Sequence, residues 1–300
     1  MPICSLRRVQ ATKSVVPTQS MEKTTPWIVD VNAAQQLIEA GATILDVRSR
    51  IVWGFGHVIN ARCVNWQDFS QKTLPDKGKL LDNSQVLEQL LRQIGISNNN
   101  PVIVVGNPTS PLHFGEEGRI VWMLRTLGYC QATFVDGGQQ ALVTAGVALE
   151  MWGSQPQQVG DFRINRTTTW EIQADQLQCK LNNSPDLIIV DNREAREYFG
   201  ATPYGEKRGG HIPGAVHFYF KELLQPNGCL LSSEQIDYKL KLVGIEKGSD
   251  QEIITYCTGG IRSAFFVAVL VNLGYTNVKN YAGSMWEWSQ AESSSHPLVN

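Results

Sequence analysis

The 300-residue sequence has few cysteines and no excess of either charge, and these absences exclude several classes of protein. Its six cysteines form no C-x-x-C pair and no histidine cluster has metal-ligand spacing, so neither a disulfide framework nor a metal site is expected. The formal net charge is -2 without a basic stripe, which gives nucleic-acid binding no electrostatic support. No apolar run approaches the ~20 residues of a membrane span. We therefore expect a protein of a reducing compartment, placed in the cytoplasm, that needs no cofactor and binds neither nucleic acid nor membrane.

The composition predicts a folded chain of two domains behind a short tail. Residues 1–25 are polar and weakly basic and lack the apolar segment of a secretion signal, so we expect a disordered tail. The whole chain is 42% hydrophobic and 18% charged, which is typical of globular proteins. At roughly 100–200 residues per domain, the remaining length suggests two domains, each large enough to bury a core.

One order of strands, turns and helices occurs twice, which indicates a duplicated domain and not a short-period solenoid. The landmarks that match are Asp46-Val47-Arg48 with Asp191-Asn192-Arg193, His57 with His211, Leu127-Gly128-Tyr129 with Leu273-Gly274-Tyr275, and Gly137 with Gly283. Alternating strands and helices predict an α/β fold with a mostly parallel sheet, flanked by helices, in each half. We place the halves at residues 26–150 and 169–300, joined by a polar linker at 151–168. In the second half we expect helices at 174–181, 233–243 and 263–273, and strands at 186–193, 252–256 and 277–281.

The most informative stretch begins with an apolar, β-prone run that ends in Cys257. A glycine-bearing loop leads from this cysteine to Arg262, and an apolar segment with the character of a buried helix follows. A thiol between a strand and a helix N-terminus faces backbone N–H groups and the positive end of the helix dipole, which stabilise a thiolate. In the first half Gly106 occupies the place of Cys257 and a longer, proline-broken loop follows it, so only the second half is expected to carry chemistry.

Four landmarks of this chain resemble those of the tandem-domain rhodaneses, the thiosulfate and 3-mercaptopyruvate sulfurtransferases. They are Asp191-Asn192-Arg193, His211-Ile212-Pro213-Gly214-Ala215, the loop Cys257 to Arg262, and Tyr281-Ala282-Gly283-Ser284-Met285-Trp286-Glu287-Trp288, within a likeness that covers Trp27 to Pro297. The resemblance implies an inactive first half and a second half whose Cys257 becomes a persulfide. Departures from the pattern are Lys207, Met285 and, where two-domain members often place a substrate-binding arginine, Glu197.

The residues of the loop suggest a role for each. Cys257 is the predicted nucleophile, which takes sulfane sulfur from a small anionic donor and passes it to cyanide or a thiol. The loop residues Thr258, Gly259, Gly260, Ile261 and Arg262 are expected to surround the sulfur, with the two glycines allowing the backbone angles of an amide cradle and Arg262 offering a forked cation to the donor. Arg193 is a further candidate for the site, although it can instead brace the strand end with Asp191. We assign supporting roles to Asp191, His211 and Trp288, with Trp286 and Trp288 packed against the loop, and expect a monomer.

Several alternatives remain open at this point. Thiosulfate is the first choice of donor because the loop ends in a cation, and 3-mercaptopyruvate is the second. A non-catalytic sulfur-relay or redox-sensing protein could carry the same loop. A cysteine-dependent phosphatase is disfavoured, since four residues separate Cys257 from Arg262 where phosphatases have five, which leaves little room for a phosphoryl group.

Overall fold

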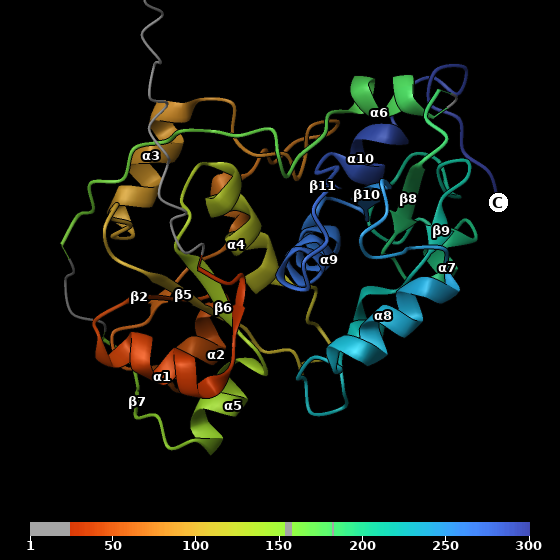
Figure 1. Ribbon diagram of the computed structural model, residues 1–300. Coiled ribbons are helices and arrows are strands. Elements are labelled where there is room, and N and C mark those ends of the chain that lie inside the picture. The colour runs from red at the N-terminus through yellow and green to blue at the C-terminus, as the bar shows by residue number, and fades with distance from the viewer. Residues whose placement is uncertain (1–24, 154–157, 182) are drawn as a thin grey trace, which may run out of the picture.

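The computed structural model describes residues 25–153, 158–181 and 183–300, and it consists of two α/β halves that lie side by side (Figure 1). The first half contains a parallel five-stranded sheet in the order β1-β6-β5-β2-β4. Its strands are β1 (Ile28–Val29), β2 (Thr43–Asp46), β4 (Arg62–Cys63), β5 (Val102–Val105) and β6 (Ala132–Val135), and β3 (His57–Val58) pairs antiparallel with β7 (Leu149–Glu150). Its helices are α1 (Val31–Glu39), α2 (Arg50–Gly54), α3 (Ser84–Gln93), α4 (Glu116–Thr126) and α5 (Gly138–Thr144), with a 3-10 turn at Trp66–Phe69.

The second half repeats this arrangement with a parallel sheet in the order β11-β10-β8-β9. Its strands are β8 (Leu187–Asp191), β9 (Val216–His217), β10 (Glu252–Tyr256) and β11 (Val278–Asn280). Its helices are α6 (Ala174–Lys180), α7 (Ala195–Tyr198), α8 (Ser233–Leu242), α9 (Ile261–Asn272) and α10 (Ser284–Trp288), with a 3-10 turn at Phe220–Leu223. A parallel bridge from Glu171 to Asn280 takes the place that β1 has in the first sheet. The prediction of two tandem α/β units is confirmed.

The helix after the cysteine begins at Ile261, two residues before the sequence-based expectation. Gly260 adopts φ +82°, a left-handed conformation that allows the chain to turn directly from the loop into α9. Arg262 therefore lies in the first turn of a helix, which fixes the direction of its side chain. All but the last residues of α9 are buried, because this helix packs between its own sheet and the first half.

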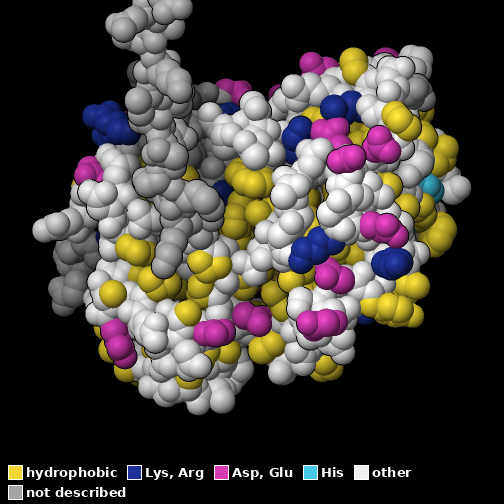
Figure 2. Space-filling model, in the orientation of Figure 1, with side chains coloured by type: hydrophobic (Ala, Val, Ile, Leu, Met, Phe, Trp, Pro, Cys, Tyr) yellow, Lys and Arg dark blue, Asp and Glu magenta, His cyan; other side chains and the backbone are white. Residues whose placement is uncertain are grey.

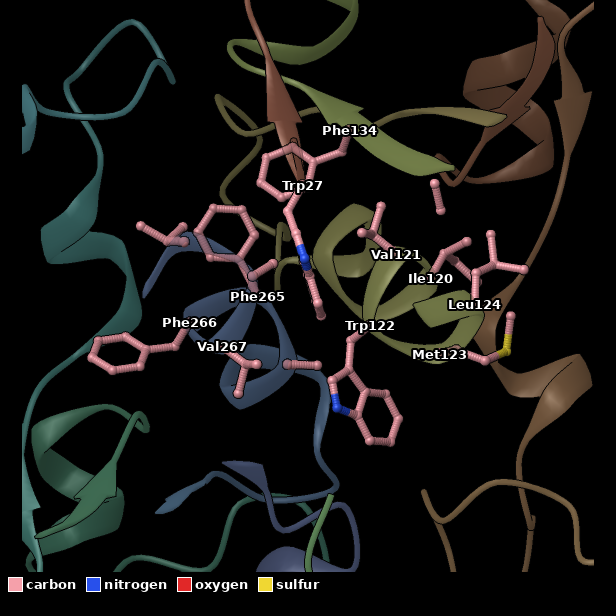
Figure 3. Packing of buried hydrophobic residues seen from close by; sticks show 14 of the residues in the cluster. Trp27, Ile120, Val121, Trp122, Met123, Leu124, Phe134, Phe265, Phe266 and Val267 are labelled. Atoms are coloured by element: carbon pink, nitrogen blue, oxygen red, sulfur yellow. The ribbon is translucent and has the colours of Figure 1, made fainter. Parts of the chain in front are cut away.

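The two halves share one hydrophobic core, whose centre is the contact between α4 and α9 (Figure 3). A side chain at Gly118 of α4 would place its Cβ 2.4 Å from the Cα of Phe265, so the missing side chain allows the helices to approach closely. Trp122 and Phe265 fill the space beside this crossing. The proposed boundaries at residues 150 and 168 stay a prediction, and the predicted tail lies almost wholly outside the described residues.

The surface carries charges of both signs. On the face in Figure 2, acidic and basic side chains are interspersed among apolar ones. In the described part of the chain, no helix combines the length and the apolar character needed to cross a membrane.

Candidate active site

Cys257 lies directly after β10, at the carboxyl edge of the sheet, in a ring of backbone and hydroxyl groups. Its Sγ accepts a hydrogen bond from the N–H of Gly260 at 3.2 Å, and the Oγ of Ser263 lies 3.6 Å from the sulfur. The N–H of Cys257 itself donates to Ser284 Oγ at 3.1 Å, which fixes the residue from the other side. The thiol is 1% exposed. A buried sulfur that faces amide donors is stabilised as an anion more than as a neutral thiol.

The surroundings of the sulfur favour its ionised form. Burial by itself raises the pKa of the Cys257 thiol, because it removes water from the thiolate. The charge of Arg262 and the hydrogen bonds from Ser263 and Gly259 outweigh that effect, and the pKa falls below its ordinary value. Cys63 and Cys229 show the opposite shift, with burial raising the pKa of each. The environment of Cys257 thus does what those of Cys63 and Cys229 do not: it lowers the pKa of the thiol.

The two loop glycines serve different purposes. Gly260 has the positive φ that an amide cradle was expected to need. Gly259 does not, and its role is to make space, because a Cβ there would lie 2.1 Å from the Trp286 ring. The expectation of special backbone angles was therefore correct for Gly260 only.

Arg262 makes a bidentate ion pair with a carboxylate, which sequence reasoning did not anticipate. Its Nη1 lies 2.6 Å from Glu197 Oε2 and its Nη2 lies 2.8 Å from Glu197 Oε1. The hydroxyl of Thr258 links both partners, accepting from Nη2 at 2.6 Å and donating to Glu197 Oε1 at 2.9 Å. Burial alone would raise the pKa of Glu197, but the guanidinium lowers it below its usual range. The Arg262 guanidinium, which was expected to bind the donor, thus already has both terminal nitrogens hydrogen-bonded to Glu197.

Arg193 is buried and does not line the cavity, so a contact between it and the donor does not fit its position. Its Nη2 donates to Asp191 Oδ2 at 2.6 Å and to the Gly210 carbonyl at 2.7 Å, and its exposure is 0%. In the half without a cysteine, Arg48 makes the same two contacts, to Asp46 Oδ2 at 2.6 Å and to the carbonyl at the equivalent turn at 2.8 Å. A contact repeated where there is no nucleophile braces the strand end in both halves.

His211 and Trp288 lie beside the site without lining it. His211 stacks on Tyr198 with ring centroids 3.6 Å apart, and its Nδ1 lies 3.1 Å from the Tyr198 carbonyl. Trp288 donates to the Pro297 carbonyl and packs edge-on against Tyr281. Trp286 lies against Gly259 of the loop, as expected, and also lines the cavity. His211 and Trp288 thus support the turn and the C-terminal segment.

A cavity of about 330 Å³ opens above Cys257 and is lined by both halves. The second half contributes Tyr204, Cys257, Thr258, Gly259, Ile261, Arg262 and Trp286, and the first half contributes Trp66, Gln67, Leu112, Phe114 and Glu116. Apart from the longer loop after Gly106, no sequence feature indicated that first-half residues would line the cavity. Burial raises the pKa of Glu116 in this wall.

The first half has no comparable cradle, because a carboxylate fills the space. A Cβ at Gly106 would lie 2.4 Å from Glu117 Oε2. Glu117 is buried and its Oε1 lies 2.8 Å from His113 Nε2. Among the His, Cys, Asp and Glu side chains of the described chain, His113, Glu116 and Glu117 are the one set of three whose possible metal-ligand atoms lie within 4.8 Å of one another. His113 and Glu117 already contact each other, however. The position that matches the nucleophile is thus occupied.

Fold and site together define a duplicated α/β protein with one cysteine in an amide cradle. The rhodanese-like domain family matches residues 30–145 and 173–291, and the chain belongs to that family. It is 29% identical over 245 residues to a thiosulfate sulfurtransferase of Pseudomonas aeruginosa, which covers 82% of this chain and 87% of that protein. It is 26% identical over 277 residues to the sulfur carrier protein TtuD of Thermus thermophilus, with 88% and 92% covered. SseA from Escherichia coli, a 3-mercaptopyruvate sulfotransferase structure, superposes with a TM-score of 0.74 at 24% identity, over 87% of this chain and 99% of that one.

Proposed function

We propose that this protein is a sulfurtransferase that moves sulfane sulfur from thiosulfate to a thiophilic acceptor through a persulfide on Cys257. The relatives bear out the sulfurtransferase class, since those named for an activity are sulfurtransferases. The observation that carries the proposal is the sulfur of Cys257 at 3.2 Å from the Gly260 N–H, at the base of a cavity. A sulfur atom added to Cys257 would enter that cavity.

The reaction is a double displacement. The Cys257 thiolate attacks the outer sulfur of thiosulfate, a new S–S bond forms, the donor S–S bond breaks, and sulfite leaves with its electron pair. Cyanide then attacks the terminal sulfur of the persulfide, thiocyanate leaves, and the thiolate is restored. The free thiolate and the persulfide both place negative charge on sulfur at the loop, where the amides and the helix N-terminus stabilise it. With 3-mercaptopyruvate a C–S bond breaks instead, and the enolate of pyruvate leaves and takes up a proton.

The charge of an anionic donor requires a cation other than the paired Arg262. Lys77 of the first half meets this need, since its Nζ lies 4.0 Å from the centroid of the Trp286 ring, which lines the cavity. Lys77 is half-buried and forms no ion pair with a carboxylate of the described residues, whereas the neighbouring Lys79 pairs with Asp76 and Glu287. A cation–π contact is worth only about 0.5–1 kcal/mol at such a site. We therefore assign Lys77 the role of meeting the donor at the mouth of the cavity.

A sulfur-relay protein is the second candidate, favoured by the relative named as a sulfur carrier. Such a protein would receive sulfur on Cys257 from a partner protein and would not take it from a small donor. The cavity above Cys257 argues for a small donor, because its volume of about 330 Å³ is that of a small-molecule site.

Steady-state assays test the proposal. Thiocyanate is measured with thiosulfate or 3-mercaptopyruvate as donor and cyanide as acceptor, for the wild type and for Cys257→Ser. We expect turnover that the substitution abolishes, with thiosulfate the better donor. Turnover of neither donor, with sulfur accepted from a persulfidated protein, would favour the relay. Hydrolysis of aryl phosphates lost in Cys257→Ser would instead indicate a phosphatase.

We also propose that the active unit is a monomer in a reducing compartment. Both walls of the cavity come from one chain, so a second copy is not needed to complete it. The described cysteines are free thiols: Cys63, Cys130, Cys179, Cys229 and Cys257. Sedimentation at micromolar concentration tests the oligomeric state, and a stable dimer as the only active species would contradict it.

A further inference from the structure

The loop that holds Cys257 also rests on a side chain from the half without a cysteine. Arg119 of α4 is 1% exposed and reaches across the interface between the halves. Its Nη1 donates to the carbonyl of Gly260 at 3.3 Å, and its Nη2 donates to the carbonyl of Gly78 and to Ser70 Oγ. Gly78 itself abuts the loop, since a Cβ there would lie 2.5 Å from the Gly259 carbonyl oxygen. One guanidinium therefore connects the first half to the Cys257 loop.

Arg119 is a buried cation without a carboxylate partner among the described residues. The other two arginines near the loop are paired, Arg262 with Glu197 and Arg193 with Asp191. Three neutral acceptors and the face of Trp122, 4.6 Å away, surround the Arg119 guanidinium. A buried charge with no counter-charge is costly, so such groups are retained where an anion balances them.

Two anions act on Arg119, the Cys257 sulfur and, more weakly, the Glu171 carboxylate, which is itself paired with Arg166. Burial lowers the pKa of Arg119 to about 9, and the charge of Cys257 is the first influence that opposes this fall. Gly260 connects the two groups, because its N–H donates to Cys257 Sγ while its carbonyl accepts from Arg119. The Arg262 charge is largely cancelled by Glu197, which leaves Arg119 as the buried cation at the loop whose charge is not already neutralised. Arg125 is also buried without a carboxylate partner in the described part of the chain, but its contacts lie away from the loop.

We infer that Arg119 is a positioning residue of the active site: it holds Gly260 with its N–H toward the sulfur and supplies, beside Arg262, a second counter-charge for the Cys257 thiolate and persulfide. The inference rests on the proposed function for the persulfide, but the effect on the thiolate is independent of any donor. By this inference the first half, which has no cysteine at the equivalent position, contributes a residue to the active site of the second half.

A purely structural role for Arg119 makes a different prediction. The Gly260 carbonyl also accepts a hydrogen bond from Asn280 Nδ2 at 3.1 Å, so it keeps a donor when Arg119 is replaced. Loss of the arginine charge should therefore change the ionisation of Cys257 even where the loop keeps its shape.

The test compares Arg119→Met and Arg119→Lys with a matched control, Arg125→Met. Arg125 lies on the same helix, is also buried, and donates to the carbonyls of Ala132, Thr25 and Pro26, away from the loop. After cyanide treatment, the rate of Cys257 alkylation by iodoacetamide is followed against pH on the peptide that carries it. Turnover of thiosulfate with cyanide is measured on the same samples.

We expect Arg119→Met to raise the apparent pKa of Cys257 by about one unit and to lower kcat/KM at pH 7 about tenfold. Arg119→Lys retains the charge and should stay near the wild type, and Arg125→Met should leave both quantities unchanged. A wild-type pKa in folded Arg119→Met, or an equal shift in Arg125→Met, would overturn the inference. If the Met variant does not fold, a folded Arg119→Lys with a pKa raised by a full unit would overturn it as well. Because alkylation needs no donor, absence of turnover in the wild type would count against the proposed function alone.

Discussion

Replacing Glu197, the ion-pair partner of Arg262, by glutamine removes the negative charge and keeps a side chain of nearly the same shape. The carboxylate accepts two hydrogen bonds from the guanidinium and one from Thr258, and glutamine keeps one oxygen acceptor in the same place. With the negative charge removed, Arg262 acts on the sulfur without compensation, and the pKa of Cys257 should fall further. A charge in direct contact shifts a pKa by roughly 1–3 units. Since Glu197 contacts the guanidinium and no contact joins it to the sulfur, we expect about one unit, equivalent to about 1.4 kcal/mol.

The same change should destabilise the protein, because breaking a buried ion pair costs about 3–5 kcal/mol and glutamine recovers part of it. The assay is the pH profile of Cys257 alkylation, with denaturant unfolding measured alongside. Glu194→Gln is the control, since Glu194 pairs with the exposed Arg196. An unchanged or raised pKa of Cys257 in folded Glu197→Gln would refute the claim that this carboxylate tempers the Arg262 charge. The direction is opposite to that expected for Arg119→Met, so one general loss of structure cannot produce both results.

Three further predictions follow from the packing around the two loops. Gly106→Cys should gain no persulfide when Cys257 is replaced by serine, since a carboxylate already fills the equivalent space; a persulfide on the new cysteine would contradict this. Gly259→Ala should lower kcat/KM at least tenfold by displacing the Trp286 ring, and Trp286→Leu in the same chain should recover part of the loss; a double variant no better than the single one would refute the steric cause. Lys77→Met should raise KM for thiosulfate about threefold to tenfold with kcat little changed, while replacement of the exposed Lys72 by methionine should leave KM unchanged. Equal effects of the two substitutions would show that Lys77 acts only as one surface charge among others.

The fold could be predicted because its signals are local and occur twice. The apolar run at 252–256 is the strand β10 with the same bounds, and the repeated Asp-x-Arg landmark makes the same contacts in both halves. The start of α9 was misplaced, since the φ of Gly260 depends on how the loop closes over the sulfur and the sequence does not reveal this.

The site could be predicted in part. Cys257 and its loop follow from spacing, because amides next in sequence to the thiol are also its neighbours in space. The partner of Arg262 lies 65 residues away on α7, and Arg119 is brought to the loop only by the packing of α4 on α9. Such contacts between distant segments leave no periodic or spacing signal in a single sequence. Glu197 was recognised as unusual, but its consequence for the charge of Arg262 needed the geometry.

The most direct measurement is the mass of the Cys257 peptide after the protein is treated with cyanide and then with thiosulfate. One added sulfur atom, about 32 Da, should appear on this peptide and on no other, and a second cyanide treatment should remove it as thiocyanate. No adduct, or an adduct on another cysteine that supports the same turnover, would contradict the assignment of Cys257 as the sulfur carrier.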